Sequence, residues 1–340
     1  MENLIMPDRL KKGDTVATVS LSWGGAGDEE LLFRYNTGKK RIEDILGLKV
    51  VEMENTLKGT SFIYNHPEKR AEDLMNAFKD PNIKGIISCI GGDDSIRLLP
   101  YIDYDVICKN PKIFMGYSDT TISHLILFKA GIRSYYGPSI LAEFGENIEI
   151  FPYTLDYINK IFFNGDSLGE IKPAKYWTGE RVPWLYENRF IKKHMEKNTN
   201  YEVLQGEGVA RGKLFGGCVD VLEMAKGTEI WPNLESFSDT ILFLETSEET
   251  MSPDNLLYAF RNYGALGILE RLNGIVFGKP YQNKYYSEYK QVIRKALSEY
   301  NLGNLPVLYN LSFGHNQPMH IIPYGAIAQI DTNNIEFSII

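Results

Sequence analysis

Cysteine is scarce in this 340-residue chain, and the three that occur, Cys89, Cys108 and Cys218, are widely spaced. An odd number of separated cysteines offers no disulfide framework and is typical of a reducing compartment, so we expect a cytoplasmic protein. No Cys-x-x-Cys pair occurs, and none of the five histidines lies three or four residues from another. The sequence therefore lacks the ligand spacings of a zinc site, and we predict no metal.

Long hydrophobic runs and an excess of positive charge are also missing. No apolar stretch approaches the roughly 18 residues that a membrane helix needs, and the N-terminus shows no basic segment followed by an apolar one, as a secretory signal does. Lysine and arginine number 36 against 44 acidic residues, a formal net charge of -8. This is the wrong sign for phosphate backbones or anionic lipid, so we expect neither nucleic acid nor membrane as a main partner.

What is present is the composition of an ordinary globular protein, with 44% hydrophobic and 24% charged residues. At roughly 150 residues per domain the length predicts about two domains. A polar, aromatic segment with weak periodicity interrupts the pattern from Asn164 to Gly212. We therefore predict an N-terminal domain at 1–165, a linker with an aromatic substrate loop at 166–212, and a C-terminal domain at 213–340.

Apolar strands alternate with amphipathic helices on both sides of that linker. In the first half we expect strands at 14–20, 48–53, 84–90 and 112–115 and helices at 32–46, 67–78 and 122–130. In the second half we expect helices at 216–224, 253–264 and 287–300 and strands at 240–244, 274–278, 306–311 and 326–330. Continuous apolar strands that end in glycine-rich turns are typical of parallel sheets buried on both faces. The prediction is an α/β protein whose N-terminal domain is a doubly wound parallel sheet.

The glycine-rich loop after the first strand is a poor dinucleotide site. Gly25-Ala26-Gly27 is followed by Asp28 and two glutamates. These acids would repel a pyrophosphate at the position where the dinucleotide fingerprint needs a third glycine. We predict no nucleotide cofactor.

Ser118 is the candidate nucleophile. It lies in the turn Gly116-Tyr117-Ser118-Asp119-Thr120-Thr121, between a short strand and a helix. Such a turn exposes the serine Oγ and places the next backbone N–H, that of Asp119, where an oxyanion would form. The same residues also fit a helix N-cap, and the local sequence leaves both interpretations open.

A base and an orienting acid are needed beside such a serine. His315 lies in a turn among polar groups, whereas His124 lies in the apolar helix 122–130 and is better explained as a packed or capping histidine. Glu245 directly follows the apolar strand Thr240–Leu244. The strand would deliver its carboxylate to a loop, where it could orient an imidazole.

Five segments in this order resemble the LD-carboxypeptidase family of serine peptidases, and the resemblance covers nearly the whole chain. Within the family they are most similar to the microcin C immunity peptidase (MccF-like) branch, because Gly-Gly-Asp-Asp-Ser replaces the Arg-Gly-Gly-Tyr-Gly type turn of murein enzymes. The segments are Ile90-Gly91-Gly92-Asp93-Asp94-Ser95, Gly116-Tyr117-Ser118-Asp119-Thr120-Thr121, Phe215-Gly216-Gly217, Leu244-Glu245-Thr246-Ser247-Glu248-Glu249 and Phe313-Gly314-His315.

The resemblance implies a catalytic triad of Ser118, Glu245 and His315, with an oxyanion hole made by the backbone N–H groups of Gly92 and Asp119. It implies a swivelling-type C-terminal α/β domain, a homodimer and no cofactor. The expected activity is that of a serine carboxypeptidase-type amidase, which cleaves a small or acidic acyl group from an aminoacyl-adenylate analogue. Cleavage of murein tetrapeptides is the alternative.

For the residues that would contact the substrate, the sequence leaves two interpretations open. Asp93 and Asp94 could bind a substrate ammonium group or could simply interact with a helix dipole. Trp177 and Trp184 could stack on a nucleobase or could pack the loop onto a domain boundary or a dimer interface.

A non-enzymatic α/β ligand-binding protein is the competing class. In that interpretation both glycine-rich turns bind an anion and Ser118 only caps a helix. Asp93, Asp94 and Asp119 argue against it, because acids at these turns oppose an anion but leave N–H donors usable for acyl transfer.

Overall fold

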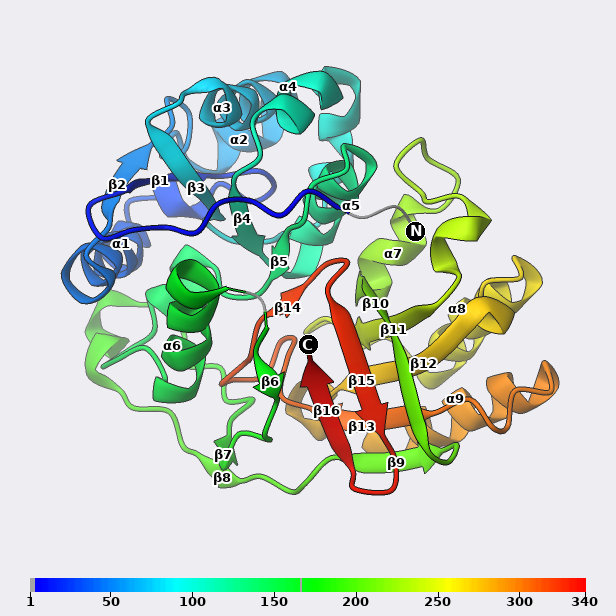
Figure 1. Ribbon diagram of the computed structural model, residues 1–340. Coiled ribbons are helices and arrows are strands. Elements are labelled where there is room, and N and C mark those ends of the chain that lie inside the picture. The colour runs from blue at the N-terminus through cyan, green and yellow to red at the C-terminus, as the bar shows by residue number, and fades with distance from the viewer. Residues whose placement is uncertain (1–3, 166) are drawn as a thin grey trace. The chain divides into compact units, whose positions relative to one another are not determined.

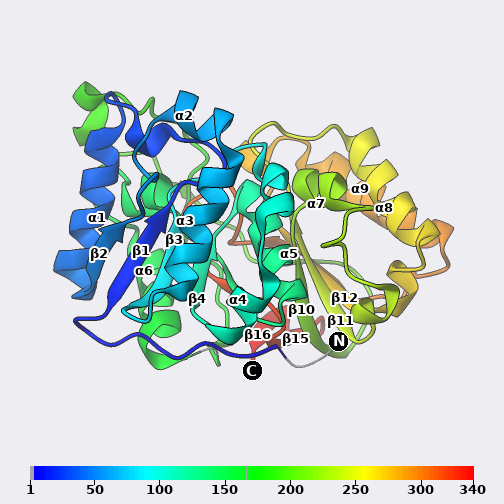
Figure 2. The same cartoon turned by 90° about the horizontal axis from the view of Figure 1, so that it is seen from above.

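Two compact α/β units make up the computed structural model, which describes residues 4–165 and 167–340 (Figures 1 and 2). The α/β class expected from the sequence is confirmed. The segment expected as one linker is divided, because its middle part belongs to the first unit and its flanks belong to the second. The N-terminal unit comprises Leu4–Gly165 and Glu180–His194, and the C-terminal unit comprises 167–179 and Met195–Ile340.

The N-terminal unit contains a parallel sheet with the strand order β5-β4-β3-β1-β2. Figure 1 shows α2, α3 and α4 on one side of this sheet and α1 on the other, which is the doubly wound arrangement. Its strands are β1 (Thr15–Val19), β2 (Lys49–Glu52), β3 (Ile83–Ser88), β4 (Ile113–Gly116) and β5 (Tyr135–Tyr136). Its helices are α1 (Leu32–Leu46), α2 (Thr60–Asn65), α3 (Pro67–Lys79), α4 (Tyr104–Lys109), α5 (Thr121–Lys129) and α6 (Pro152–Asn159).

The strand order reverses at β1, whose neighbours are β2 on one side and β3 on the other. In β3 every residue except Lys84 is buried, as a strand covered on both faces requires. Loops at the carboxyl ends of strands beside such a reversal form the usual ligand crevice of open α/β sheets. The loops after β1 and β3 are therefore the expected position of a ligand site in this unit.

The C-terminal unit contains a mixed sheet with the order β6-β16-β15-β10-β11-β12-β13-β9, in which β10 to β13 are parallel. Figure 2 shows α7, α8 and α9 on the same side of these parallel strands. The central elements are β10 (Val209–Cys218), α7 (Val219–Ala225), β11 (Thr240–Glu245), α8 (Pro253–Ala265), β12 (Leu272–Gly278), α9 (Tyr286–Glu299) and β13 (Val307–Leu311). The remaining strands are β6 (Gly169–Glu170), β7 (Tyr176–Trp177), β8 (Glu196–Lys197), β9 (Glu202–Gln205), β14 (Ile322–Pro323), β15 (Ile327–Asp331) and β16 (Glu336–Ile339).

One prediction of local structure was wrong. Gly216 and Gly217 were expected to open a helix, but they lie near the end of β10, and α7 begins only at Val219. A Cβ at Gly216 would lie 1.7 Å from the carbonyl oxygen of Phe243 in the adjacent strand. The glycine is needed here because two strands approach closely, which a sequence pattern cannot distinguish from a turn.

In the described part of the chain, no helix is both long and apolar enough to cross a membrane. Among the same residues, no group of three or more His, Cys, Asp or Glu side chains is placed to hold a metal ion.

Candidate active site

Ser118 lies at a sharp turn at the carboxyl end of β4. Its φ of 63° is in the left-handed region, which residues other than glycine rarely adopt. A short 3-10 turn, Ser118–Thr120, then leads into α5, which begins at Thr121. A residue that only caps a helix has an extended backbone conformation. The observed turn is the strained strand-to-helix geometry that exposes a nucleophilic serine.

The loop after β3 lies directly beside this serine. A Cβ at Gly91 would lie 2.8 Å from the Cβ of Ser118 and 3.2 Å from the backbone nitrogen of Asp119. The next residue, Gly92, has a φ of 145°, and a Cβ there would lie 2.2 Å from the Oγ of Ser22. Glycine at these positions allows the loop after β3 to approach the serine turn at Gly91 and the loop after β1 at Gly92. The two residues predicted to donate oxyanion N–H groups, Gly92 and Asp119, thus belong to loops in contact at Ser118.

Asp119 and Ser95 join the same two loops by hydrogen bonds. The backbone N–H of Ser95 donates to Oδ2 of Asp119, and the Ser95 hydroxyl donates to the Asp119 carbonyl, both at 2.9 Å. Burial raises the pKa of the Asp119 carboxyl group. Through the hydrogen bond from Ser95, the Asp119 side chain links the serine turn to the loop after β3.

Asp94 is occupied by two arginines. Its carboxylate lies 2.7 Å from Nη1 of Arg70 and 2.9 Å from Nη1 of Arg97. The Arg70 side chain is fully buried and also donates to the carbonyls of Leu21 and Ser22, in the loop after β1. Asp94 therefore fixes the loop after β3 to the loop after β1, whereas the side chain of Asp93 is exposed to solvent.

His124 is packed, as expected from its helix. Nε2 lies 2.9 Å from the Gly116 carbonyl and Nδ1 lies 2.8 Å from the Ser134 hydroxyl. Because a carbonyl only accepts, Nε2 carries the proton and Nδ1 accepts from Ser134. Burial lowers the pKa of His124 to about 4, so the ring is neutral and supports the end of β4 just before the serine turn.

Glu245 and His315 form a hydrogen-bonded pair in the C-terminal unit. Glu245 is the last residue of β11 and its side chain is 1% exposed, while His315 lies in the loop after β13. Nδ1 of His315 lies 2.7 Å from Oε2 of Glu245. The preceding Gly314 has a φ of 96°, and a Cβ there would lie 2.6 Å from the same carboxylate oxygen. The candidate base and the candidate orienting acid therefore have the hydrogen-bond relation that a triad would need.

Glu248 is a third member of this group, and its role was not predicted from the sequence. Its Oε2 lies 3.0 Å from Nε2 of His315. Burial disfavours the imidazolium, but the charge of Glu245 and the hydrogen bonds from both carboxylates outweigh it and raise the pKa of His315 to about 10. The ring is thus protonated at neutral pH in this structure. The sequence signal was the spacing of three residues from Glu245, which places both acids around one loop.

The two candidate tryptophans belong to different units. Trp184 is half-buried in the N-terminal unit, with its ring centroid 6.4 Å from that of Trp23, and the Arg34 guanidinium lies 4.5 Å from its ring. Trp177 is 6% exposed in the C-terminal unit, where Nζ of Lys279 lies 4.5 Å from its ring. Trp23 and Arg34, which contact the Trp184 ring, were not predicted from the sequence, because only the folded chain brings them to this ring.

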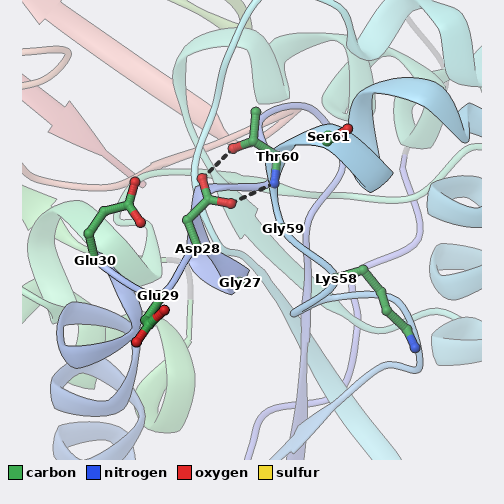
Figure 3. Close-up of a pocket in the computed structure, with 8 residues that line it drawn as sticks. All are labelled: Gly27, Asp28, Glu29, Glu30, Lys58, Gly59, Thr60 and Ser61. Atoms are coloured by element: carbon green, nitrogen blue, oxygen red, sulfur yellow. Dashed lines mark hydrogen bonds between the residues drawn. The ribbon is translucent and has the colours of Figure 1, made fainter.

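A shallow surface hollow follows the loop after β1 (Figure 3). Asp28 accepts hydrogen bonds from the backbone N–H and the hydroxyl of Thr60, at the start of α2. Glu29, Glu30 and Lys58 also line the hollow. Asp28 therefore links the loop after β1 to the start of α2.

Family models match both halves of the chain. The model of the LD-carboxypeptidase N-terminal domain matches residues 16–137, and that of the LD-carboxypeptidase C-terminal domain matches residues 211–330.

Individual relatives and solved structures also match nearly the whole chain. The microcin C7 self-immunity protein MccF of Escherichia coli is 30% identical over 297 residues, covering 86% of this chain and 84% of the relative. The crystal structure of an MccF-like protein from Streptococcus pneumoniae in complex with AMP has a TM-score of 0.89 and 35% identity, covering 96% of this chain and 99% of that one. A Bacillus subtilis protein named "Probable murein peptide carboxypeptidase" is 24% identical, covering 96% of this chain and 91% of the relative.

Proposed function

Because this chain belongs to the LD-carboxypeptidase family, and within it is MccF-like, we propose that it is a serine-dependent amidase with the triad Ser118, Glu245 and His315. Membership of the family makes it a peptidase. The observation that carries the serine mechanism is the left-handed backbone of Ser118 at the end of β4. The Glu245–His315 pair supports it from the C-terminal unit.

The reaction follows from the roles of these groups. The Ser118 Oγ attacks the acyl carbon, and its proton passes to Nε2 of His315. Glu245 keeps the imidazole oriented through Nδ1, while the N–H groups of Gly92 and Asp119 stabilise the oxyanion. His315 then protonates the leaving amine. Water hydrolyses the acyl-enzyme with His315 again acting as base, which restores the serine.

Glu248 must move away from His315 before the histidine can accept the serine proton. Its carboxylate occupies Nε2 of His315, the nitrogen that must accept the serine proton. We therefore propose that Glu248 releases this nitrogen when substrate binds, and that the pKa of His315 falls on release. His315 can then act as a base near neutral pH.

We propose an aminoacyl-adenylate analogue as the substrate class. The S. pneumoniae relative was solved with AMP, and MccF, at 28% identity and a TM-score of 0.85, was solved with aspartyl sulfamoyl adenosine. Of the two tryptophans, Trp184 is the better nucleobase platform, since Trp177 is nearly buried. Asp93 is the better candidate for a substrate ammonium group, because its side chain is exposed whereas Asp94 is paired with two arginines. Murein tetrapeptide cleavage is the second candidate function, supported by the name of the B. subtilis relative.

A cytoplasmic location and a homodimer stay predictions.

The test is to incubate the protein separately with aspartyl sulfamoyl adenosine and with a murein tetrapeptide, and to follow products by mass. Ser118→Ala should lose nearly all turnover, by several powers of ten, while the protein stays folded. If Ser118 were only a cap, the replacement would cost roughly 1 kcal/mol of stability and little turnover. An active Ser118→Ala protein would overturn the triad, and no turnover of any acyl amide would favour the ligand-binding alternative.

A further inference from the structure

Lys279 is a largely buried lysine whose ammonium nitrogen makes no hydrogen bond to the described residues and keeps some contact with solvent. It directly follows β12 and is 6% exposed. Its Nζ lies 4.5 Å from the Trp177 ring and 5.6 Å from the Tyr286 ring. Among residues 4–165 and 167–340, no carboxylate or other acceptor lies within bonding distance of this nitrogen. Aromatic faces attract a cation but accept no conventional hydrogen bond, so the rings leave the N–H donors of Nζ open to water or to a ligand.

The acids near Lys279 do not supply the missing partner. Glu202 accepts from Nζ of Lys290 at 2.8 Å and from the Tyr286 hydroxyl, so its carboxylate is already paired. Glu196 acts on Lys279 only through its more distant charge. Burial lowers the pKa of Lys279 to about 8 in spite of both acids. Burial removes much of the water around this ammonium group, while solvent still reaches Nζ, so the nitrogen is open to a negative charge that arrives from outside.

The position of Lys279 connects it to the candidate catalytic histidine. Its backbone N–H donates to the carbonyl of Leu311 at 2.9 Å, and its carbonyl accepts from Nδ2 of Asn316 at 2.8 Å. Asn316 is the residue after His315. Lys279 is therefore anchored to the loop that carries His315, at the carboxyl ends of the parallel strands β12 and β13.

We propose that Lys279 is an anion subsite of the C-terminal unit, framed by Trp177 and Tyr286, that binds an oxyanion group of the substrate. This rests on the proposed function. A carboxypeptidase substrate carries a free carboxylate, and an acyl-adenylate or its analogue carries a phosphate or sulfamate. Either group would accept charge-assisted hydrogen bonds from the ammonium and restore the charge that burial disfavours.

The first test measures binding without turnover. The titration of the Lys279 amine is followed by NMR in the intact protein, alone and with acetate or with AMP. A bound anion should raise the pKa of Lys279 from about 8 toward the ordinary lysine value near 10.5. A response to acetate alone assigns the subsite to a carboxylate, and a response to AMP alone assigns it to a phosphate. An unchanged titration with both overturns the proposal, and neither result depends on whether Ser118 is the nucleophile.

The second test uses Lys279→Met, which keeps the length of the side chain, and the exposed Lys284→Met as its control. With the substrate that the wild type turns over, Lys279→Met should raise KM about 10- to 100-fold, as expected for loss of a charge-assisted hydrogen bond. An uncharged analogue of that substrate, amidated or esterified at the anionic group, should show no such loss, and Lys284→Met should change neither. Equal losses on the charged and uncharged substrates would assign Lys279 to packing and sink the subsite.

Discussion

At the scale of single residues, the protonation state of His315 decides whether it can serve as the proposed base. Nδ1 contacts Glu245 and Nε2 contacts Glu248, and this pairing raises the pKa of His315 above its ordinary value of 6.5 to about 10. A raised pKa in the folded state means that protonation favours folding. The stability that these contacts contribute is fully present below pH 6.5 and is lost as the pH rises toward about 10. Catalysis has the opposite dependence, because it needs the neutral ring.

Replacing Glu248 with Gln should lower the pKa of His315, because one of the two carboxylates that stabilise the imidazolium is removed. We expect the acidic limb of the kcat/KM profile to move to lower pH by about one pH unit or more. Histidine NMR and the pH profile measure this directly.

The adjacent Glu249→Gln is the matched control and should leave the profile unchanged, because the carboxylate at Nε2 of His315 is that of Glu248. An identical profile for wild type and Glu248→Gln would show that this contact does not govern the base.

At the scale of elements, buried strands could be predicted from sequence and polar contacts could not. β3 and β11 were identified because each contains a continuous apolar run and nearly every residue in them is buried. β9, at one edge of the sheet, and β16, between β6 and β15, were missed, since each has only four residues, half of them polar, and does not stand out from loops. The serine turn was visible because its residues are consecutive.

The contributors to the site that sequence reasoning missed have partners distant along the chain. Arg70 binds Asp94 and two carbonyls of the loop after β1, and Trp23 meets Trp184. Periodicity shows which face of a helix is buried, but it does not show which loop that face reaches.

Arg70→Met should loosen the loops after β1 and β3 together. It leaves the carboxylate of Asp94 with only one arginine in a buried setting, and breaking such a pair costs about 3 to 5 kcal/mol of unfolding free energy. Turnover should fall by about 100-fold if the Gly91-Gly92 turn no longer holds its N–H groups in place. Urea unfolding and kcat give the two values.

Arg97→Met is the comparison, since Arg97 binds the same carboxylate but its side chain is 39% exposed. It should cost about 1 kcal/mol or less, as exposed ion pairs do. Equal losses in the two variants would mean that the buried network does not organise the turn.

At the scale of the whole molecule, the candidate chemistry is divided between the two units. The N-terminal unit contributes Ser118 and the proposed oxyanion donors, whereas the C-terminal unit contributes Glu245 and His315. The aromatic candidates are divided in the same way, with Trp184 in the first unit and Trp177 in the second. Trp177 and Trp184 were predicted to lie in one substrate loop because they are only seven residues apart. In the structure each ring packs against residues of its own unit. Replacing Trp184 and Trp177 one at a time therefore shows which of the two units contributes to substrate binding.

Trp184→Ala should raise KM for an aminoacyl sulfamoyl adenosine by about 5- to 150-fold, the range expected when one base stack worth roughly 1 to 3 kcal/mol is lost. A base-free acyl amide should be far less affected, because only the nucleobase meets the ring. Trp177→Ala should instead lower stability and change both substrates alike, since its ring is buried against Lys279. Steady-state kinetics on the two substrates, with thermal unfolding of each variant, separate these effects. Equal losses for Trp184→Ala on both substrates would assign this ring to packing as well, and would make murein-type peptides the better candidate substrates.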